Sequence, residues 1–143
     1  MTNDRADSAI FSQLAAELLA GGISFRFQAK GRSMIPTIAD GDVLHVESVN
    51  PRGLKLGDIA LSQQGAEFKA HRIIGKRGDL FIIRGDAGVA IDVISPEQIV
   101  GKVIAKECRD SGRVTSISGP KARVEFFWRA LRCRMRSVLS CGA

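Results

Sequence analysis

The stretch FKAHRIIGKRGDLFIIRGD, residues 68–86, decides the fold class of this chain. It contains two runs rich in β-branched and aromatic residues, FKAHRIIG and DLFIIRGD, which meet at the turn residues Arg77-Gly78-Asp79. Short runs of this kind, bounded by Gly and Asp, are typical of β-strands joined by tight turns. The stretch therefore predicts two successive strands of an antiparallel sheet.

The same pattern continues on both sides of this stretch. Four more strand-like runs occupy residues 24–31, 42–49, 57–63 and 99–107, with sequences SFRFQAKG, DVLHVESV, GDIALSQ and IVGKVIAKE. Strands this short, at this spacing, imply an antiparallel sheet that curls into a small barrel or sandwich. We therefore expect a mainly β protein whose β domain covers residues 23–107.

Helices are expected to flank this domain. Residues 8–20 place apolar side chains at helical spacing before Gly21-Gly22, so residues 1–22 are expected to form an amphipathic helix. Residues 108–143 are expected to form a linker, with a short strand at 114–117, and then a second amphipathic helix that opens at Pro120. The apolar face of this second helix comprises Val124, Phe127, Trp128, Leu131, Met135 and Val138.

The charge of the chain is concentrated at its C-terminal end. Of the net charge of +6, residues 121–143 contribute six Lys/Arg against one acid. Two interpretations of this basic helix stay open: it packs on the β domain, or it attaches to an anionic membrane surface. Nucleic-acid binding is not expected, because no helix-turn-helix spacing or aromatic stacking motif accompanies the charge.

Composition limits the remaining possibilities. The 143 residues, 45% of them hydrophobic and 25% charged, suffice for one core. No apolar run is long enough for a membrane span, and Asp4 and Asp7 stand where a secretory signal carries basic residues. We therefore expect a cytoplasmic protein, with peripheral attachment to the inner face of the membrane as the alternative. The three cysteines lack the spacing typical of metal sites, so we expect reduced thiols without a catalytic role.

The candidate chemistry centres on GRSMIPTIADGDVLHVE, residues 31–47. A serine hydroxyl such as that of Ser33 is a weak nucleophile unless a neighbouring base takes its proton. The chain has only two histidines; His45 alternates in a half-buried strand and is expected to be structural, whereas His71 is the candidate base. Further along the chain, RGDAG and Ile91-Asp92 supply two carboxylates, Asp86 and Asp92, within reach of a loop that could orient an imidazole.

These motifs, in this order, resemble the signal peptidase I family and, more distantly, the repressor autopeptidases that share its fold. The likeness covers about half of the chain, from Gly31 to Lys106. It consists of G-R-S-M-x-P-T, D-G-D, L-G-D-I, H-R-I-I-G-K-R-G-D, and R-G-D-A followed by a further Asp and I-V-G-K-V. The resemblance implies a β-rich peptidase domain that cuts a peptide bond without metal or cofactor.

The resemblance also implies residue roles. Ser33 attacks the scissile carbonyl, and His71 stands where the archaeal and endoplasmic-reticulum members carry their histidine base. Asp86 is the first choice for the group that orients His71, Asp92 the reserve, and Lys69 a fallback base. The Ser33 backbone N–H is the expected oxyanion donor, and the surrounding substrate-binding loop comprises Gly31, Arg32, Met34 and Pro36.

The expected function is hydrolysis of a peptide bond in a leader, signal or propeptide. The alternative is an inactive or weakly active module that binds a peptide in the same groove. This alternative is motivated by Gly31, which stands where many family members have a hydroxyl residue, and by the lack of the family's membrane anchor. Self-cleavage is not expected, because no DNA-binding domain and no Ala-Gly loop precede Ser33.

Overall fold

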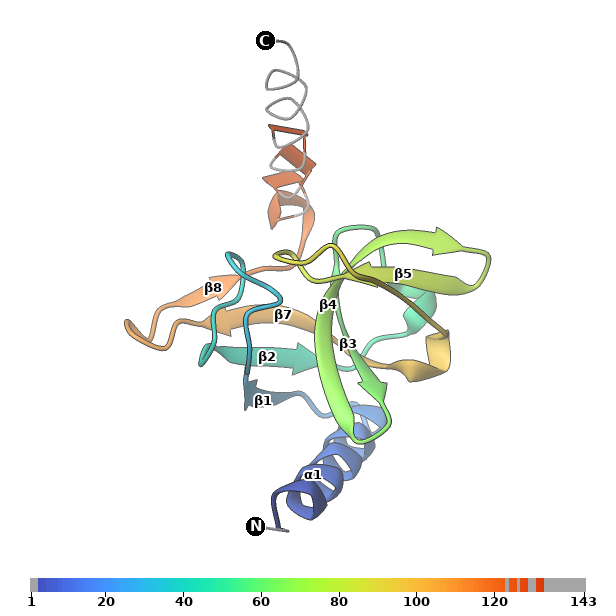
Figure 1. Ribbon diagram of the computed structural model, residues 1–143, viewed down its shortest axis with the longest axis vertical. Coiled ribbons are helices and arrows are strands. Elements are labelled where there is room, and N and C mark those ends of the chain that lie inside the picture. Colours follow the sequence, from blue (N-terminus) through green and yellow to red (C-terminus); the bar gives the residue numbers. More distant parts are fainter. Residues whose placement is uncertain (1–2, 123, 126, 129–130, 133–143) are drawn as a thin grey trace.

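The computed structural model describes residues 3–122, 124–125, 127–128 and 131–132. Within this part of the chain the protein is mainly β, with a single eight-stranded antiparallel sheet and few helices (Figure 1). The helices are α1 (Asn3–Ala20) and two 3₁₀ turns, Pro51–Gly53 and Pro96–Gln98. The strands are β1 (Phe25–Gln28), β2 (Val43–Glu47), β3 (Ile59–Gln64), β4 (Glu67–Arg77), β5 (Leu80–Arg84), β6 (Ile91–Ile94), β7 (Ile99–Glu107) and β8 (Val114–Ser116).

The strand order places the two halves of β4 in different surroundings. The order is β1-β2-β7-β3-β4-β5-β6, with β8 paired to β7. The first half of β4 pairs with β3, from Glu67 opposite Gln64 to Arg72 opposite Ile59. Pairing with β5 begins only at Arg72, opposite Arg84. The second edge of β4 therefore stays open over residues 67–71.

Each of the six strand-like runs contains a strand, but two details differ from expectation. The four-residue β6 was not expected. Its exposed positions are occupied by the apolar Ile91 and Val93, so its residue types do not follow the apolar-in, polar-out alternation of a half-buried strand. Helix α1 begins at Asn3, several residues before the apolar run of residues 8–20. The short strand expected at residues 114–117 is present as β8, which pairs with β7.

Two apolar clusters make up the core. The first lies between α1, the sheet and the β1–β2 loop, and comprises Leu19, Met34, Ile38, Leu44, Val46, Ile59, Leu61, Val103 and Ile117. The second lies under β5 and β6 and comprises Leu54, Ala60, Ile73, Phe81, Ile83, Ile94 and Ile99.

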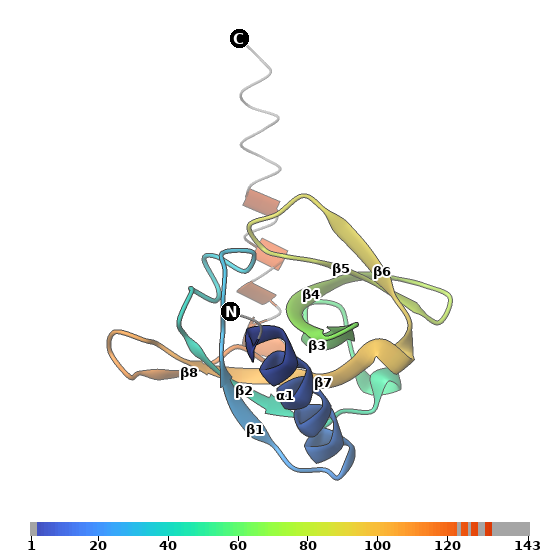
Figure 2. The same cartoon turned by 60° about the horizontal axis from the view of Figure 1, so that its bottom comes forward.

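Helix α1 packs closely against the sheet, as Figure 2 shows. Its Leu19 reaches the first cluster beside Gly101 of β7. A Cβ added at Gly101 would lie 2.6 Å from Val46 Cγ1 and 3.1 Å from Leu19 Cδ1. The glycine thus provides the space in which the helix approaches the sheet.

Two buried aspartates attach turns to β7. Asp42 accepts hydrogen bonds from the Ala39 backbone N–H at 2.9 Å and from Lys106 at 3.4 Å. Asp58 repeats the arrangement: it accepts the Lys55 backbone N–H at 3.0 Å and pairs with Lys102 at 3.2 Å. Each aspartate thus combines a turn hydrogen bond with an ion pair to β7. The pair at Asp42 fixes the end of the loop that carries Ser33.

Beyond β8 the described residues 120–122, 124–125, 127–128 and 131–132 are helical and extend away from the sheet (Figure 1). Their apolar side chains are exposed: Val124, Phe127, Trp128 and Leu131. Among the described residues, no helix combines the length and the apolar character needed to cross a membrane. Two residues of the expected apolar face, Met135 and Val138, lie outside the described residues. The same holds for the basic residues Arg129, Arg134 and Arg136.

Candidate active site

Ser33 lies in the loop between β1 and β2, which is anchored at both ends. The Ala29 backbone N–H donates to the Asp42 carbonyl at 2.8 Å, and the Gly31 N–H donates to the Asp40 carboxylate at 2.8 Å. Gly31 has a φ of +92°, in the region that favours glycine. Next to Ser33, the Met34 side chain is only 4% exposed and packs into the first core cluster. The loop is therefore fixed while the serine side chain stays at the surface.

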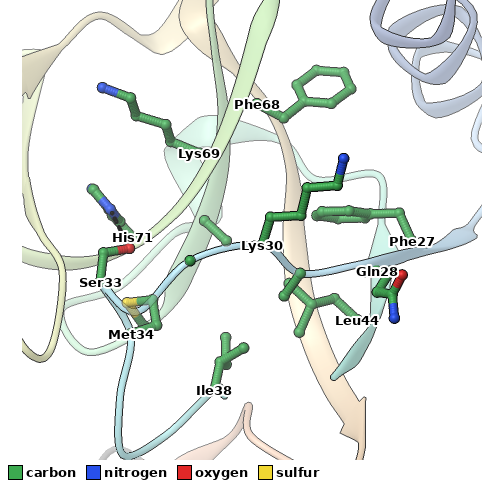
Figure 3. A pocket seen from close by; sticks show the side chains of 13 residues that line it. Phe27, Gln28, Lys30, Ser33, Met34, Ile38, Leu44, Phe68, Lys69 and His71 are labelled. Carbon is green, nitrogen blue, oxygen red and sulfur yellow. Dashed lines mark hydrogen bonds between the residues drawn. The ribbon is translucent and has the colours of Figure 1, made fainter. Parts of the chain in front are cut away.

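His71 comes from β4 and meets this serine. Its Nε2 lies 3.2 Å from Ser33 Oγ, although the residues are 38 positions apart in the chain (Figure 3). The distance is at the upper end of hydrogen-bond reach for a nucleophile and its base, which is often longer without substrate. The structure therefore brings together the two residues on which the sequence argument depended.

The loop after β5 supports Ser33 from behind. The Ala87 backbone N–H donates to the Ser33 carbonyl at 3.0 Å. Gly85 lies against the same carbonyl, so closely that a Cβ added there would collide with the Ser33 carbonyl oxygen. A residue without a side chain is therefore required behind the serine.

Asp86 occupies a different position from the one expected. Its Oδ1 accepts from Arg72 Nε at 2.8 Å, and its Oδ2 accepts from Arg72 Nη2 at 2.7 Å and from Thr37 Oγ1 at 2.6 Å. Arg72 also donates to the Gly57 carbonyl at 2.8 Å. Asp86 thus makes no hydrogen bond to His71. It connects β4, the Ser33 loop and the loop behind Ser33.

The environment of His71 favours its neutral form. Burial has the largest effect and lowers the pKa of His71. The negative charges of Asp92 and Asp86 raise this pKa, and the positive charge of Lys69 lowers it. The net pKa lies below the ordinary 6.5. Asp92, on β6, is thus the carboxylate with the larger influence, ahead of Asp86. Within the described residues, His71 Nδ1 is buried and has no hydrogen-bond partner. Neither aspartate therefore orients the ring by direct hydrogen bonding.

A cavity of about 250 Å³ opens beside the Ser33–His71 pair. One wall is the chain from Phe27 to Gly31, and the other is β4 from Phe68 to His71 (Figure 3). Its lining comprises Phe27, Gln28, Ala29, Lys30, Gly31, Ser33, Met34, Ile38, Leu44, Phe68, Lys69, Ala70 and His71. Of the four residues expected to bind substrate, Gly31 and Met34 line the cavity, whereas Arg32 and Pro36 lie outside its lining.

The backbone N–H of Ser33, the expected oxyanion donor, differs from that of Gly31 in its hydrogen bonding. In the described part of the chain, the backbone N–H of Ser33 donates to no protein acceptor, whereas the N–H of Gly31 is taken by Asp40. An N–H group fixed in this way next to the nucleophile can stabilise negative charge on a substrate oxygen. The Ser33 N–H thus stays available for the role expected of it.

Several site features were not anticipated from the sequence. The contact of Arg72 with Asp86 and Thr37 was missed, although Arg72 directly follows the candidate base and Thr37 belongs to the Ser33 motif. The cavity-lining role of Lys30 was also missed. The other histidine, His45, lies on β2, and its Nε2 is 3.8 Å from a Glu107 carboxylate oxygen.

No group of three or more His, Cys, Asp or Glu side chains in the described residues is placed to hold a metal ion. No protein-family model matches the chain, and no curated protein matches it significantly.

Proposed function

We propose that this protein is a serine endopeptidase that hydrolyses a peptide bond in a leader, signal or propeptide. The observation that carries the proposal is the 3.2 Å approach of His71 Nε2 to Ser33 Oγ beside the cavity of about 250 Å³, which we call the cleft. The motif resemblance to signal peptidase I supports the same chemistry. No metal or other cofactor takes part in it.

The proposed reaction proceeds in two steps. Ser33 Oγ attacks the scissile carbonyl carbon while His71 Nε2 takes the hydroxyl proton, and the Ser33 N–H stabilises the oxyanion. His71 then gives the proton to the leaving amine as the peptide bond breaks, leaving an acyl-serine. Water, deprotonated by His71, attacks this ester, and the acid product leaves as the serine regains its proton.

The substrate is proposed to bind as an extended strand. Residues 67–71 of β4 have an open edge, and β1 pairs only with β2 in the described sheet. The cavity lies between these two open edges. A peptide added there can form main-chain hydrogen bonds while its side chains enter the apolar lining, and its carbonyl groups pass Ser33.

A fluorophosphonate probe tests the chemistry, since it phosphonylates an activated serine with loss of fluoride. We expect wild type to be labelled, and Ser33→Ala and His71→Ala to remain unlabelled. Ser48→Ala, which removes an exposed serine after β2, is the matched control and should label like wild type. Labelling of Ser33→Ala at the wild-type rate would refute the peptidase proposal.

A second candidate function is peptide binding without cleavage. It is favoured by His71 Nδ1, which has no hydrogen-bond partner among the described residues to fix the ring. Without such a partner a base loses part of its preorganisation. If the probe fails to label wild type while the cleft still binds peptides, the binding module is the better description.

We further propose that the domain works in the cytoplasm and attaches to an anionic membrane surface through its C-terminal segment. The exposed apolar residues of this segment follow helical spacing: Val124, Phe127, Trp128 and Leu131. Residues 121–143 also carry six basic residues against one acid.

Trp128 is the sole tryptophan, so its fluorescence reports directly on this segment. We expect its emission to shift to the blue with phosphatidylserine-containing vesicles and to stay unchanged with phosphatidylcholine alone. No shift with either vesicle would refute attachment.

A further inference from the structure

The walls of the cleft carry two positive charges and no negative one. Of the thirteen lining residues, Lys30 and Lys69 are the charged ones at neutral pH apart from any charge on His71, and none is Asp or Glu. Lys30 comes from the segment after β1 and Lys69 from β4, so they stand on opposite walls (Figure 3).

Neither ammonium group has a counter-ion in the part of the chain that the structure describes. Within the described residues, Lys30 and Lys69 make no ion pair, whereas Lys102 and Lys106 pair with the buried Asp58 and Asp42. The nearest acid along β4, Glu67, is exposed and makes no ion pair with Lys69 among these residues. The cleft therefore presents positive charge that the fold itself does not neutralise.

Both lysines lie within three residues of a reacting residue along the chain. Lys69 and His71 are two residues apart on one strand, so they share a face and are separated by roughly 6.6 Å along it. The charge of Lys69 is felt at His71, whose pKa it lowers. Lys30 approaches from the other wall, three positions before Ser33. A strand bound in the cleft would therefore pass both ammonium groups within a few residues of the bond at Ser33.

We infer that the cleft selects an extended peptide that carries a carboxylate side chain close to the scissile bond, with Lys30 and Lys69 as the residues that recognise it. This inference rests on the proposed function in that the same cleft binds the substrate. A glutamate or aspartate there meets two unpaired cations, whereas a lysine is repelled by them. Partly exposed pairs of this kind should favour the acidic peptide roughly three- to tenfold over its neutral isostere.

Peptide binding to the Ser33→Ala protein tests this without requiring cleavage. The probes are fluorescein-labelled peptides of alanine and valine that carry one Glu, Gln or Lys at each position in turn, and the readout is fluorescence anisotropy. We expect a Glu peptide to bind more tightly than the matching Gln peptide, and high salt to reduce the difference. Equal affinities at every position, or no binding of any peptide, would overturn the inference.

Charge variants in the same background identify the residues. Lys30→Gln combined with Lys69→Gln should abolish the preference for Glu, and Lys30→Glu combined with Lys69→Glu should reverse it in favour of Lys. Lys55→Gln, which removes an exposed positive charge outside the cavity lining, should retain the preference. A preference that survives in both double variants would overturn the assignment.

The outcomes also separate this inference from the peptidase proposal. Selective binding by Ser33→Ala, together with a failure of wild type to react with the fluorophosphonate probe, would sustain the acidic preference and refute catalysis. Cleavage of peptides by wild type without any preference for Glu would support catalysis and refute the acidic preference.

Discussion

Arg72 and Asp86 form a two-point ion pair, with Nε 2.8 Å from Oδ1 and Nη2 2.7 Å from Oδ2. The pair is nearly removed from solvent, since the Arg72 side chain is 4% exposed and that of Asp86 is 9% exposed. Arg72 directly follows His71 on β4, and Asp86 belongs to the loop behind Ser33. The ion pair therefore fixes the strand of the candidate base against the segment that supports the candidate nucleophile.

Replacing Asp86 should destabilise the protein strongly. Asp86→Asn removes the carboxylate charge opposite a buried guanidinium, and breaking a buried pair in this way costs about 3–5 kcal/mol. The free energy of unfolding, measured by urea denaturation, should fall accordingly. Asp79→Asn makes the same chemical change at an exposed turn and should stay within about 0.5 kcal/mol of wild type. Equal stability of both variants would mean that the ion pair does not hold the site together.

Substituting Gly85 should impair the reaction of Ser33. A Cβ at position 85 collides with the Ser33 carbonyl oxygen, so Gly85→Ala must displace the serine or its loop. Displacement of a reacting group by even a fraction of an ångström is costly, and we expect labelling by the fluorophosphonate probe to slow at least about tenfold.

The matched control for this substitution lies in the same loop. A Cβ at Gly88 meets only ordinary contacts, 3.8 Å from the Gly85 carbonyl oxygen and 4.0 Å from the Ala90 nitrogen. Gly88→Ala should therefore label at close to the wild-type rate. If both variants are labelled at the same rate, the close approach of Gly85 to Ser33 does not affect the reaction of the serine.

The labelling rate should follow the ionisation of His71. Only the neutral imidazole accepts a proton, and the pKa of His71 is lowered by burial. The rate should therefore rise with pH and reach half of its maximum below pH 6.5. Lys69→Gln removes a charge that lowers the pKa, so the midpoint should move up; Asp92→Asn removes one that raises it, so the midpoint should move down.

Lys55→Gln serves as the control for this experiment, because Lys55 is not among the groups that shift the pKa of His71. Its midpoint should equal that of wild type. Midpoint shifts of the same sign for Lys69→Gln and Asp92→Asn would contradict the electrostatic account.

Asp42 should contribute stability that is lost in acid. Burial by itself raises the pKa of Asp42, but the backbone N–H groups of Ala39 and Arg109 and the charge of Lys106 lower it, and the net pKa lies below 3.8. A carboxyl whose pKa is lower in the folded state stabilises the protein above its unfolded pKa and ceases to do so as the pH falls through its folded pKa.

Asp42→Asn should therefore reduce the free energy of unfolding by about 1.5–3 kcal/mol at pH 7, the range for hydrogen bonds to a charged group. The difference between wild type and variant should shrink when the urea denaturation is repeated below pH 3.8. A difference that is the same at both pH values would show that the carboxylate charge is not what matters at this position.

The sequence predicted the main strands because their apolar residues alternate or cluster between Gly and Asp turns. It failed at β6, where Ile91 and Val93 stay exposed, and at the start of α1, which extends beyond the apolar run to Asn3. Such boundaries depend on neighbouring strands and on backbone hydrogen bonding. Neither can be read from the residue types of a short segment.

The candidate pair was identified from residue type together with the motif resemblance. The chain has two histidines, and only His71 lies in a strand segment that accompanies the Ser33 motif in the family it resembles. The partner of the base was not predictable, because Asp86 and Asp92 are equivalent carboxylates until their surroundings are known. In the structure Asp86 is bound by Arg72 and Thr37, and Asp92 has the larger influence on the pKa of His71.

By itself the sequence identified a candidate nucleophile and a candidate base, and it predicted most of the strands. These follow from residue type and from patterns over a few positions. Only the tertiary structure decided which groups meet, such as Thr37 with Asp86 across 49 positions, or Lys30 opposite Lys69. The physical reason is that a charge or hydrogen-bond donor interacts with its nearest partner in space, and that partner is fixed by the pairing of distant strands.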